Sequence, residues 1–253
     1  MIDIHSHILP GLDDGAETIE ESLEMLRIAT ASGTTDIVAT PHANPQFRYD
    51  PELVDSLCNH LRARTKGLIN IHTGCDFHVT FENLLDALEN PEKFTINHRR
   101  YLMVELPDMV ALPPMRTAMQ RLIHAGILPV ITHPERNPSL QARLQELELW
   151  VRDGCLLQVT GQSLLGRFGP SAQRAADYLL SANLVHFVAS DAHDTQDRTP
   201  DLSEAYRYIS SHYGRGRADL LFTENPSAAL WGEPTTLAIE PKPSRLSRLL
   251  RRR

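Results

Sequence analysis

Short apolar runs along the chain alternate with longer segments in which apolar residues recur every three or four positions. The short runs have the length of β-strands and are rich in Val, Ile and Leu, with little strict alternation of apolar and polar residues. This pattern is typical of parallel strands that are buried on both faces. We therefore predict seven strands, at residues 2–4, 36–40, 69–74, 101–105, 128–132, 155–160 and 184–190.

The segments between these strands carry the start and stop signals of helices. Thr18 and Glu21 have the spacing of a capping box, and Gly33 is a suitable stop for the helix that follows them. Asp50 and Pro51 provide a cap and a first helical residue for the next helix. Helices are predicted at residues 18–33, 50–67, 114–125, 138–153, 171–181 and 201–212, with a short one after residue 226.

Strands that alternate with helices in this way indicate βα units and a parallel sheet, so the predicted class is α/β. The chain has 253 residues, an ordinary length for one α/β barrel. No internal repeat or low-complexity linker divides it. We predict a single domain over residues 1–232, followed by a basic, proline-containing tail over residues 233–253.

Charge is distributed unevenly along the chain. The net charge is −7, but residues 242–253 hold six basic and no acidic residues, which leaves a net charge of −13 on the rest. An acidic body argues against a nucleic-acid partner, because phosphate backbones are bound by basic surfaces. In the tail, Leu246, Leu249 and Leu250 have helical spacing, so a weak contact with an anionic membrane surface is one hypothesis and a solvated, unfolded tail is the other.

The three cysteines, Cys58, Cys75 and Cys155, show no paired spacing and suggest a reducing compartment. The sequence shows no long apolar stretch and no secretory leader, so a cytoplasmic location is expected. Cys58 and Arg64 have the Cys-x5-Arg spacing of cysteine phosphatases, but no glycine lies between them to form a phosphate-binding loop. We interpret Cys58 as a core residue.

Nine histidines and carboxylates recur at one place in the predicted topology, which is the carboxyl end of a strand or the loop beyond it. His5 and His7 alternate along an extended segment, so both imidazoles can reach one ion. The other seven are Asp14, His42, Asp76, Glu105, His133, Asp191 and His193. The carboxyl ends of strands are where barrel enzymes assemble their sites.

This set exceeds the needs of one ion and suits two or three. Nitrogen and oxygen donors without thiolate favour zinc, manganese or iron over magnesium or calcium. The alternative is that polar strand-end residues merely satisfy loop backbones, but nine converging donors argue against it.

The other histidines are not expected to bind metal directly. His186 is predicted to be a core residue, and His60, His124 and His212 are predicted to lie on helix surfaces or at helix ends. The roles of His72, His78 and His98 stay undecided, although His78 is close enough to Asp76 in sequence to support it.

Several motifs give these residues a family resemblance. The chain opens on Ile-Asp-Ile-His-Ser-His-Ile-Leu-Pro-Gly-Leu-Asp-Asp-Gly-Ala, and then shows Ala-Thr-Pro-His, Ile-Thr-His-Pro-Glu-Arg, Ala-Ser-Asp-Ala-His and Glu-Asn-Pro in order. With these motifs the chain resembles PHP-domain proteins, specifically the CpsB/CapC family of bacterial manganese-dependent tyrosine phosphatases. The resemblance covers about residues 1–232.

The resemblance implies a distorted seven-stranded (β/α) TIM-like barrel that binds three metal ions, manganese above all, with iron or zinc as alternatives. The ligands of the three ions would be, in turn, His5, His7 and Asp191; Glu105 and His133, with Asp76 bridging to the first ion; and Asp14, His42 and His193. Arg136 and Arg198 would grip the phosphate. The bridging position usually carries Glu in this family, and Asp76, which is shorter by one methylene, implies a different metal spacing or affinity.

The implied reaction is hydrolysis of a phosphomonoester, in which a hydroxide held between the metals attacks phosphorus. The implied substrate is a phosphotyrosine protein, such as a membrane-associated tyrosine kinase of capsule or exopolysaccharide synthesis. Alternatives are a phosphatase of a small metabolite, of the histidinol phosphate type, and a non-catalytic, metal-bearing partner of a membrane kinase. A binuclear amidohydrolase is disfavoured, because those sites commonly use a strand-end lysine and none of Lys66, Lys93 and Lys242 ends a predicted strand.

Overall fold

The computed structural model describes residues 1–109 and 111–237. The predicted contact between the tail and a membrane falls on residues 242–253 and so lies outside the described residues. Among the residues that are described, no helix combines the length and the apolar character needed to cross a bilayer.

Parallel strands form two sheets, of three and six strands. The strands are β1 (Ile2–Ser6), β2 (Asp36–Ala39), β3 (His42–Ala43), β4 (Asn70–Thr73), β5 (Asp76–His78), β6 (Tyr101–Glu105), β7 (Leu128–Thr132), β8 (Leu156–Thr160) and β9 (Phe187–Ala189). The first sheet has the order β1-β2-β4 and the second the order β3-β5-β6-β7-β8-β9. Every pair of neighbours is parallel, as the apolar runs predicted.

The expected count of seven strands differs from the nine that the described residues form. Each predicted strand has a counterpart, but β3 and β5 are additional short strands that continue β2 and β4 after breaks of two residues. The breaks fall at Thr40-Pro41, where proline lacks a donor, and at Gly74-Cys75. Beyond the breaks the chain pairs again, and the Asp76 N–H donates to the Pro41 carbonyl at 3.0 Å.

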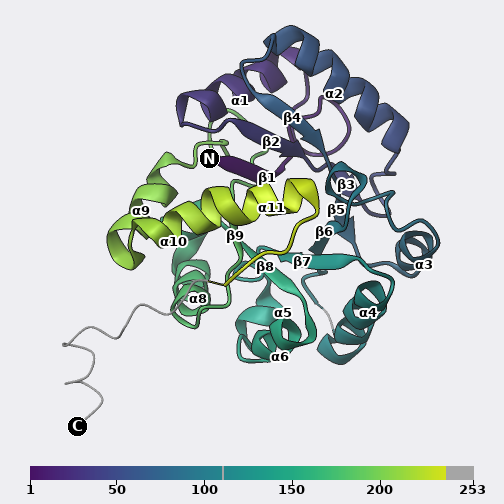
Figure 1. Cartoon of the computed structure of the whole chain (residues 1–253), viewed down its shortest axis with the longest axis vertical. Coiled ribbons are helices and arrows are strands. Elements are labelled where there is room, and N and C mark those ends of the chain that lie inside the picture. The colour runs from purple at the N-terminus through teal and green to yellow at the C-terminus, as the bar shows by residue number, and fades with distance from the viewer. Residues whose placement is uncertain (110, 238–253) are drawn as a thin grey trace.

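Backbone hydrogen bonds also join the two sheets at β1. The His7 N–H donates to the Ala192 carbonyl at 2.8 Å, and the Asp191 N–H donates to the His5 carbonyl at 2.9 Å. The strands therefore form a ring around a common centre, with most helices outside it and α11 lying across one end (Figure 1). This arrangement brings the segment after β9 next to the end of β1.

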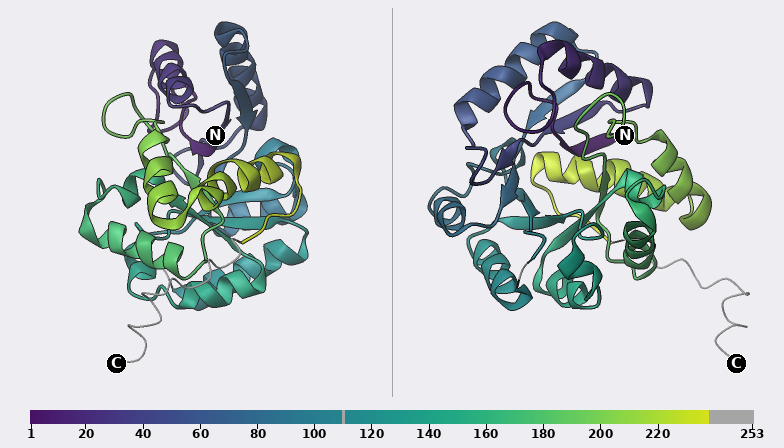
Figure 2. Two further views of the ribbon diagram at one scale, coloured as in Figure 1. Left: turned by 60° about the vertical axis from the view of Figure 1, so that its left-hand side comes forward. Right: turned by 180° about the vertical axis from the view of Figure 1, so that it is seen from behind.

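The helices mostly match their sequence signals. They are α1 (Ile19–Ala31), α2 (Pro51–Thr65), α3 (Phe81–Glu89), α4 (Leu112–His124), α5 (Pro138–Gln141), α6 (Glu146–Asp153), α7 (Gly161–Leu164), α8 (Gly169–Ser181), α9 (Ser203–Tyr213), α10 (Arg215–Asp219) and α11 (Asn225–Trp231), with a 3₁₀ turn η1 (Ile96–His98) and a π-helical turn η2 (Leu220–Glu224). Thr18 caps α1 by accepting from the Glu21 N–H at 3.2 Å, and Asp50 caps α2. The helices α1 and α2 stand side by side outside the three-stranded sheet (Figure 2).

One helix prediction needs correction, and three helices, α3, α7 and α10, were not predicted. The helix expected at residues 138–153 is divided into α5 and α6 by a turn over residues 142–145. The helix α3 was not predicted, although Thr80 caps it by accepting from the Asn83 N–H at 3.0 Å. Its segment follows β5 after only two residues, so the sequence showed no clear boundary there.

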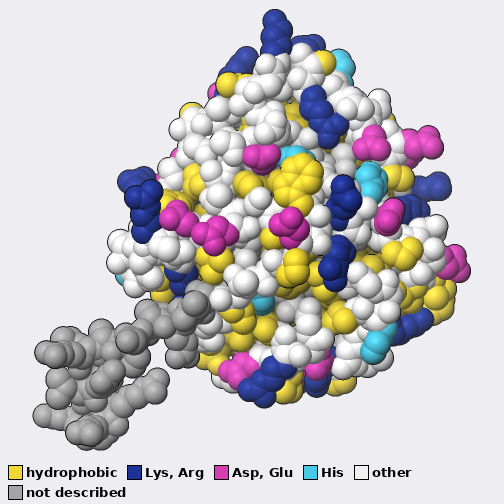
Figure 3. Space-filling view, viewed as in Figure 1, with side chains coloured by type: hydrophobic (Ala, Val, Ile, Leu, Met, Phe, Trp, Pro, Cys, Tyr) yellow, Lys and Arg dark blue, Asp and Glu magenta, His cyan; other side chains and the backbone are white. Residues whose placement is uncertain are grey.

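One end of the ring of strands is closed by α11. Apolar residues from six strands, among them Ile4, Met103, Val130 and Phe187, form an inner core with Leu230 of α11. The Asn225 side chain donates to the His186 carbonyl at 2.9 Å, so it ties α11 to the start of β9. The face that carries α11 shows acidic, basic and apolar side chains interspersed (Figure 3). The functional residues lie at the opposite end, where the strands terminate.

Candidate metal centre

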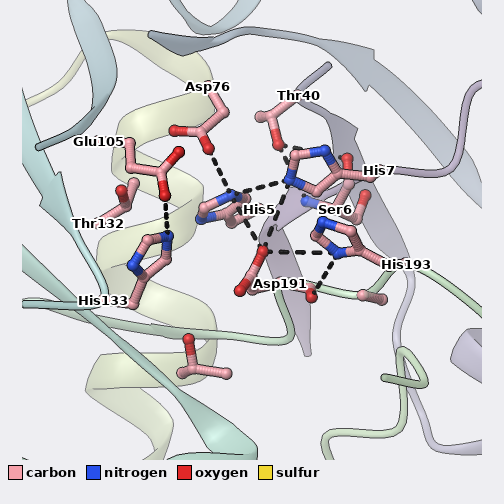
Figure 4. Close-up of polar contacts among 12 residues, drawn as sticks. His5, Ser6, His7, Thr40, Asp76, Glu105, Thr132, His133, Asp191 and His193 are labelled. Carbon is pink, nitrogen blue, oxygen red and sulfur yellow. Dashed lines mark hydrogen bonds and ion pairs between the residues drawn. The ribbon is translucent and has the colours of Figure 1, made fainter. Parts of the chain in front are cut away.

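The structure brings all nine predicted donors together at the carboxyl ends of the strands. Two sets of them converge: His5, His7, Asp191 and His193 point toward one another, and Asp76, Glu105 and His133 lie beside them (Figure 4). Asp14 and His42 complete the cluster, since the His42 Nε2 lies 3.3 Å from Asp14 Oδ1. Donor atoms from different strands approach within 4.8 Å of one another in four overlapping groups of His and carboxylate side chains.

The first cluster of donors surrounds His5. Its Nε2 lies 3.3 Å from His7 Nε2, 3.5 Å from Asp191 Oδ1 and 3.6 Å from Asp76 Oδ2. The pairing of β1 with β2 shifts register between Asp3 and Ser6, and such irregularities re-aim side chains. The two imidazoles of the His-x-His motif therefore face one point, as the extended pattern predicted.

The second cluster is built from the loop after β1, the start of β3 and the segment after β9. Asp14 Oδ1 lies 3.3 Å from His42 Nε2 and 3.5 Å from His193 Nε2. His7 adjoins this cluster, with its ring centroid 3.9 Å from that of His193. Asp14 is half-exposed whereas both histidines are mostly buried, so this cluster is open to solvent on the side of the first βα loop.

The third cluster gathers around Glu105 at the end of β6. Its Oε1 lies 3.7 Å from His133 Nε2, and its Oε2 lies 3.6 Å from His42 Nδ1. Asp76 Oδ2 lies 3.2 Å from the same His42 nitrogen, so Asp76 adjoins both this cluster and the one around His5. A bridging position for Asp76 is compatible with these contacts even though its side chain is short.

Backbone conformation at the cluster is unusual. His133 has a φ of 31° and Asp191 a φ of 52°, both in the left-handed region that side chains other than glycine seldom adopt. Each follows directly or closely on a strand end, β7 for His133 and β9 for Asp191. Such conformations cost free energy and persist where the surrounding structure enforces them, often at functional sites.

Buried polar atoms of the cluster lack hydrogen-bond partners. Both carboxylate oxygens of Asp76, the Nδ1 of His42 and the Oε2 of Glu105 are buried without a hydrogen bond in the described structure. Buried polar groups are normally satisfied, and leaving them unpaired is costly. The donors are nitrogens and carboxylate oxygens without thiolate, so these residues fit divalent ions of the manganese, iron or zinc type.

Electrostatics in the cluster shift the histidines in opposite directions. Burial opposes charge on His7 and His42, but neighbouring carboxylates prevail: Asp13 raises the pKa of His7 to about 9, and Asp14 with Asp76 raises the pKa of His42 to about 11. Burial lowers the pKa of His133 to about 3. A ligating imidazole must be deprotonated, so binding of a cation here would compete with protons on His7 and His42.

Two residues that support the histidines were missed at the level of sequence. The Asp13 carboxylate lies 2.7 Å from His7 Nδ1 and accepts from the His42 N–H at 3.0 Å, and Gln158 Oε1 lies 3.0 Å from His5 Nδ1. These contacts hold the outer ring nitrogens, so the Nε2 atoms face the cluster. Gln158 could have been found, because it is a polar residue within an apolar strand. For the adjacent residues Asp13 and Asp14, the sequence does not show which carboxylate faces the metal site and which one supports a histidine.

The two predicted phosphate ligands lie at the edge of the cluster. Arg136 donates to Asp191 Oδ2, and Arg198 donates to the same oxygen at 2.7 Å. The Phe168 ring lies against both guanidinium groups, with its centroid 4.2 Å from Arg136 Cζ and 6.0 Å from Arg198 Cζ. Residues from three separate loops therefore form one cationic edge beside the carboxylates, and Phe168 is a third contact that the sequence did not reveal.

The residues excluded from the site lie where they were expected. Cys58 is fully buried in the core, and burial raises the pKa of its thiol to about 12. His186 is buried, and its Nδ1 accepts from the Leu157 N–H at 3.2 Å. His60, His124 and His212 are exposed on helices or at their ends.

Comparisons with known proteins identify relatives that are named tyrosine-protein phosphatases. The tyrosine-protein phosphatase CpsB of Streptococcus agalactiae serotype III is 33% identical over 91% of this chain and 98% of that protein. The tyrosine-protein phosphatase YwqE of Bacillus subtilis is 34% identical over 91% of each. A solved structure described as one of the "unique metal-dependent tyrosine phosphatases" YwqE and CpsB matches with a TM-score of 0.87 at 31% identity, over 95% of this chain and all of that one.

More distant structures share the fold alone. A lactonase from Listeria monocytogenes has a TM-score of 0.56 at 13% identity and covers 94% of this chain and 95% of that one. The family described as "Capsular polysaccharide synthesis, CpsB/CapC" matches residues 1–231, nearly the whole described structure. The chain therefore belongs to the CpsB/CapC family.

Proposed function

We propose that this protein is a metal-dependent protein-tyrosine phosphatase of capsule or exopolysaccharide synthesis. The observation that carries the proposal is the convergence of nine histidine and carboxylate donors beside two arginines at one end of the strands. Membership of a family whose relatives are named tyrosine-protein phosphatases supports the same conclusion.

In this proposal the chain holds two or three divalent ions, with manganese favoured over iron and zinc. The clusters around His5, Asp14 and Glu105 would each receive one ion, and Asp76 would bridge the first and third. Divalent ions at such a centre lower the pKa of water toward neutrality and offset the charge of a phosphoryl group. Asp13 and Gln158 would fix the tautomers of His7 and His5, so that both ligating nitrogens are oriented before a metal binds.

Arg136 and Arg198 would bind the phosphoryl oxygens through their planar guanidinium groups. Both now pair with Asp191 Oδ2, so a phosphate would share or replace that contact. A phenolate leaving group, with a pKa of about 10, departs more readily than an alkoxide and needs less help from a proton donor. The Phe168 ring, which lies against both guanidinium groups, would help to position the two arginines.

The partner in this proposal is a phosphotyrosine-bearing protein, such as a membrane-associated tyrosine kinase, met in the cytoplasm. Residues 1–232 would form the catalytic domain, with its strands forming one interrupted seven-stranded barrel. Residues 233–253 would be an accessory tail. The small-metabolite phosphatase and the non-catalytic kinase partner are the rival functions that an assay must separate.

The test is a comparison of substrates on one enzyme preparation. Purified protein loaded with Mn²⁺ should hydrolyse p-nitrophenyl phosphate and a phosphotyrosyl peptide, lose activity to a chelator, and keep it after thiol alkylation, because Cys58, Cys75 and Cys155 are buried. A preference for histidinol phosphate over the peptide would favour the metabolite phosphatase. No turnover with any divalent metal would leave only the non-catalytic role.

A further inference from the structure

His78 lies in the cluster around Glu105 but is absent from the expected ligand set. It sits on β5 two residues after Asp76, so both side chains leave the strand on the same side. Its register partner on β6 is Glu105, and its Nε2 is in contact with Glu105 Oε2. Neighbouring strands therefore place Asp76, His78 and Glu105 around one point.

The position of His78 is fixed by its backbone. Its carbonyl accepts from the Thr80 N–H at 2.9 Å and from the Asn83 side chain at 3.0 Å. Asn83 also donates to the Ala43 carbonyl at 2.8 Å, so it ties β5 to β3 and to the start of α3. The backbone of His78 is therefore anchored to β3 and to the start of α3, and its Nε2 faces Glu105 in the cluster.

The surroundings of His78 are those of a cation site. The donor atoms of His42, Asp76, His78 and Glu105 all lie within 4.8 Å of one another. Asp76 is fully buried, and neither of its oxygens has a hydrogen bond in the described structure. His78 Nε2 and Glu105 Oε2 are also buried atoms that make no hydrogen bond of ordinary geometry. Carboxylate oxygens and an imidazole nitrogen that crowd one small volume without a hydrogen bond of ordinary geometry are best satisfied by a metal ion.

The alternative nitrogen donor, His42, is engaged on its other side. Its Nε2 lies 3.3 Å from Asp14, in the cluster that also contains His193. One imidazole ordinarily gives one nitrogen to one ion, so a His42 that ligates through Nε2 does not serve Asp76 and Glu105. His133 approaches Glu105 only through the opposite oxygen, Oε1, at 3.7 Å. That leaves His78 as the nitrogen donor on the Oε2 side.

We propose that His78 is a direct ligand of the ion held by Asp76 and Glu105. The class of ion is the one already inferred, a divalent cation of the manganese, iron or zinc type, and the inference rests on the metal centre in the proposed function. With His78 included, this ion has donors from β5 and β6 together with His133. His78 and Glu105 are each about one-quarter exposed, so the ion keeps an open side toward solvent.

The test replaces His78 with glutamine and probes the protein with Mn²⁺ alone. The control is His60→Gln, on the exposed surface of α2. His78→Gln should weaken Mn²⁺ binding by roughly 10-fold or more in competition with a chelator, since even partners outside the ligand shell cost 10–100-fold. Electron–nuclear coupling measured on bound Mn²⁺ should show one fewer directly bonded nitrogen in His78→Gln, and no change in His60→Gln.

Unchanged nitrogen coupling in His78→Gln would overturn the proposal, because His78 would then only hydrogen-bond to Glu105. An unchanged Mn²⁺ affinity would overturn it as well. Circular dichroism of the metal-free variant should match that of the parent protein, which excludes misfolding as the cause of a loss. The readout is binding, so a parent protein that binds Mn²⁺ without turnover refutes the phosphatase function and leaves the role of His78 standing.

Discussion

The two ends of the strand ring differ in how completely their buried groups are satisfied. At the end closed by α11, apolar residues fill the interior, and the Asn225 side chain donates hydrogen bonds to the backbone carbonyls of His186 and Thr236. At the other end, Asp76 is buried with neither oxygen hydrogen-bonded, and His133 and Asp191 have left-handed backbones. The comparison suggests that one end stabilises the fold while the other is held under strain for binding and chemistry.

The largest effect is expected from Asp76→Asn. This residue lies at the end of the strand ring opposite α11, which we call the open end; the end that α11 covers is the closed end. Neutralising this carboxylate removes a charge from two of the three clusters and should lower kcat/KM for p-nitrophenyl phosphate by about 10³-fold, the upper range for a single electrostatic contact. Bound manganese per chain should fall as well. The control is Glu89→Gln, an exposed carboxylate at the end of α3. Asp76→Asn that kept full activity would remove Asp76 from the metal centre.

The opposite change, at the closed end, should affect stability and spare chemistry. Leu230→Ala opens a cavity in the inner core and should lower the free energy of unfolding by about 3 kcal/mol, measured by denaturant titration. Its neighbour Trp231 is 60% exposed, so Trp231→Ala should cost less than about 0.5 kcal/mol. The kcat of the folded fraction should be unchanged in both. A large fall in kcat for Leu230→Ala would show that the two ends are coupled.

The free energy of unfolding should depend on pH through His186, which lies just before β9 near the closed end. Burial lowers its pKa to about 4, below the value of about 6.5 for an unfolded chain. Above pH 6.5 both states are neutral; as pH falls, the unfolded state takes up the proton first, so stability is lost between about pH 6.5 and 4. The loss should reach about 2–3 kcal/mol in unfolding titrations of the metal-free protein. His186→Gln should flatten this dependence, and an unaltered slope would contradict the assignment.

The smallest effect is expected at the edge of the open end, where Phe168 lies against the two arginines. Phe168→Leu keeps apolar bulk but removes the ring face, and a contact of this kind contributes about 0.5–2 kcal/mol. Competitive inhibition by inorganic phosphate should weaken by about 10-fold. Phe81→Leu, at a ring that is 71% exposed on α3, serves as the control. Equal inhibition of all three proteins would show that Phe168 does not position the arginines.

Much of this architecture was predictable because strands and caps are local signals. The buried runs gave all seven predicted strands, and Thr18 and Asp50 cap their helices as expected. The gathering of the nine donors could also be predicted from the sequence, because each one ends or follows a predicted strand and parallel strands end at one edge of the sheet. The breaks that create β3 and β5 fall at Pro41 and Gly74, two local signals that the apolar runs alone did not reveal, and the turn at residues 142–145 left no periodic trace.

The support of the site was harder to foresee than its ligands. Gln158 reaches His5 from β8, with β9 between their strands, and Phe168 reaches Arg136 from the loop before α8. Contacts of this kind join residues far apart in sequence, and no local spacing predicts them. His78 stayed undecided for the same reason, because its partner Glu105 lies on a different strand.

Phosphatase activity is expected to depend on metal ions bound at the open end of the ring. The decisive measurement is a titration of the metal-free protein with Mn²⁺ that follows both the bound metal and the dephosphorylation of a phosphotyrosyl peptide. Activity should be absent without metal and should rise as two or three equivalents of Mn²⁺ bind per chain. Turnover by the metal-free protein, or full occupancy without any turnover, would contradict this expectation.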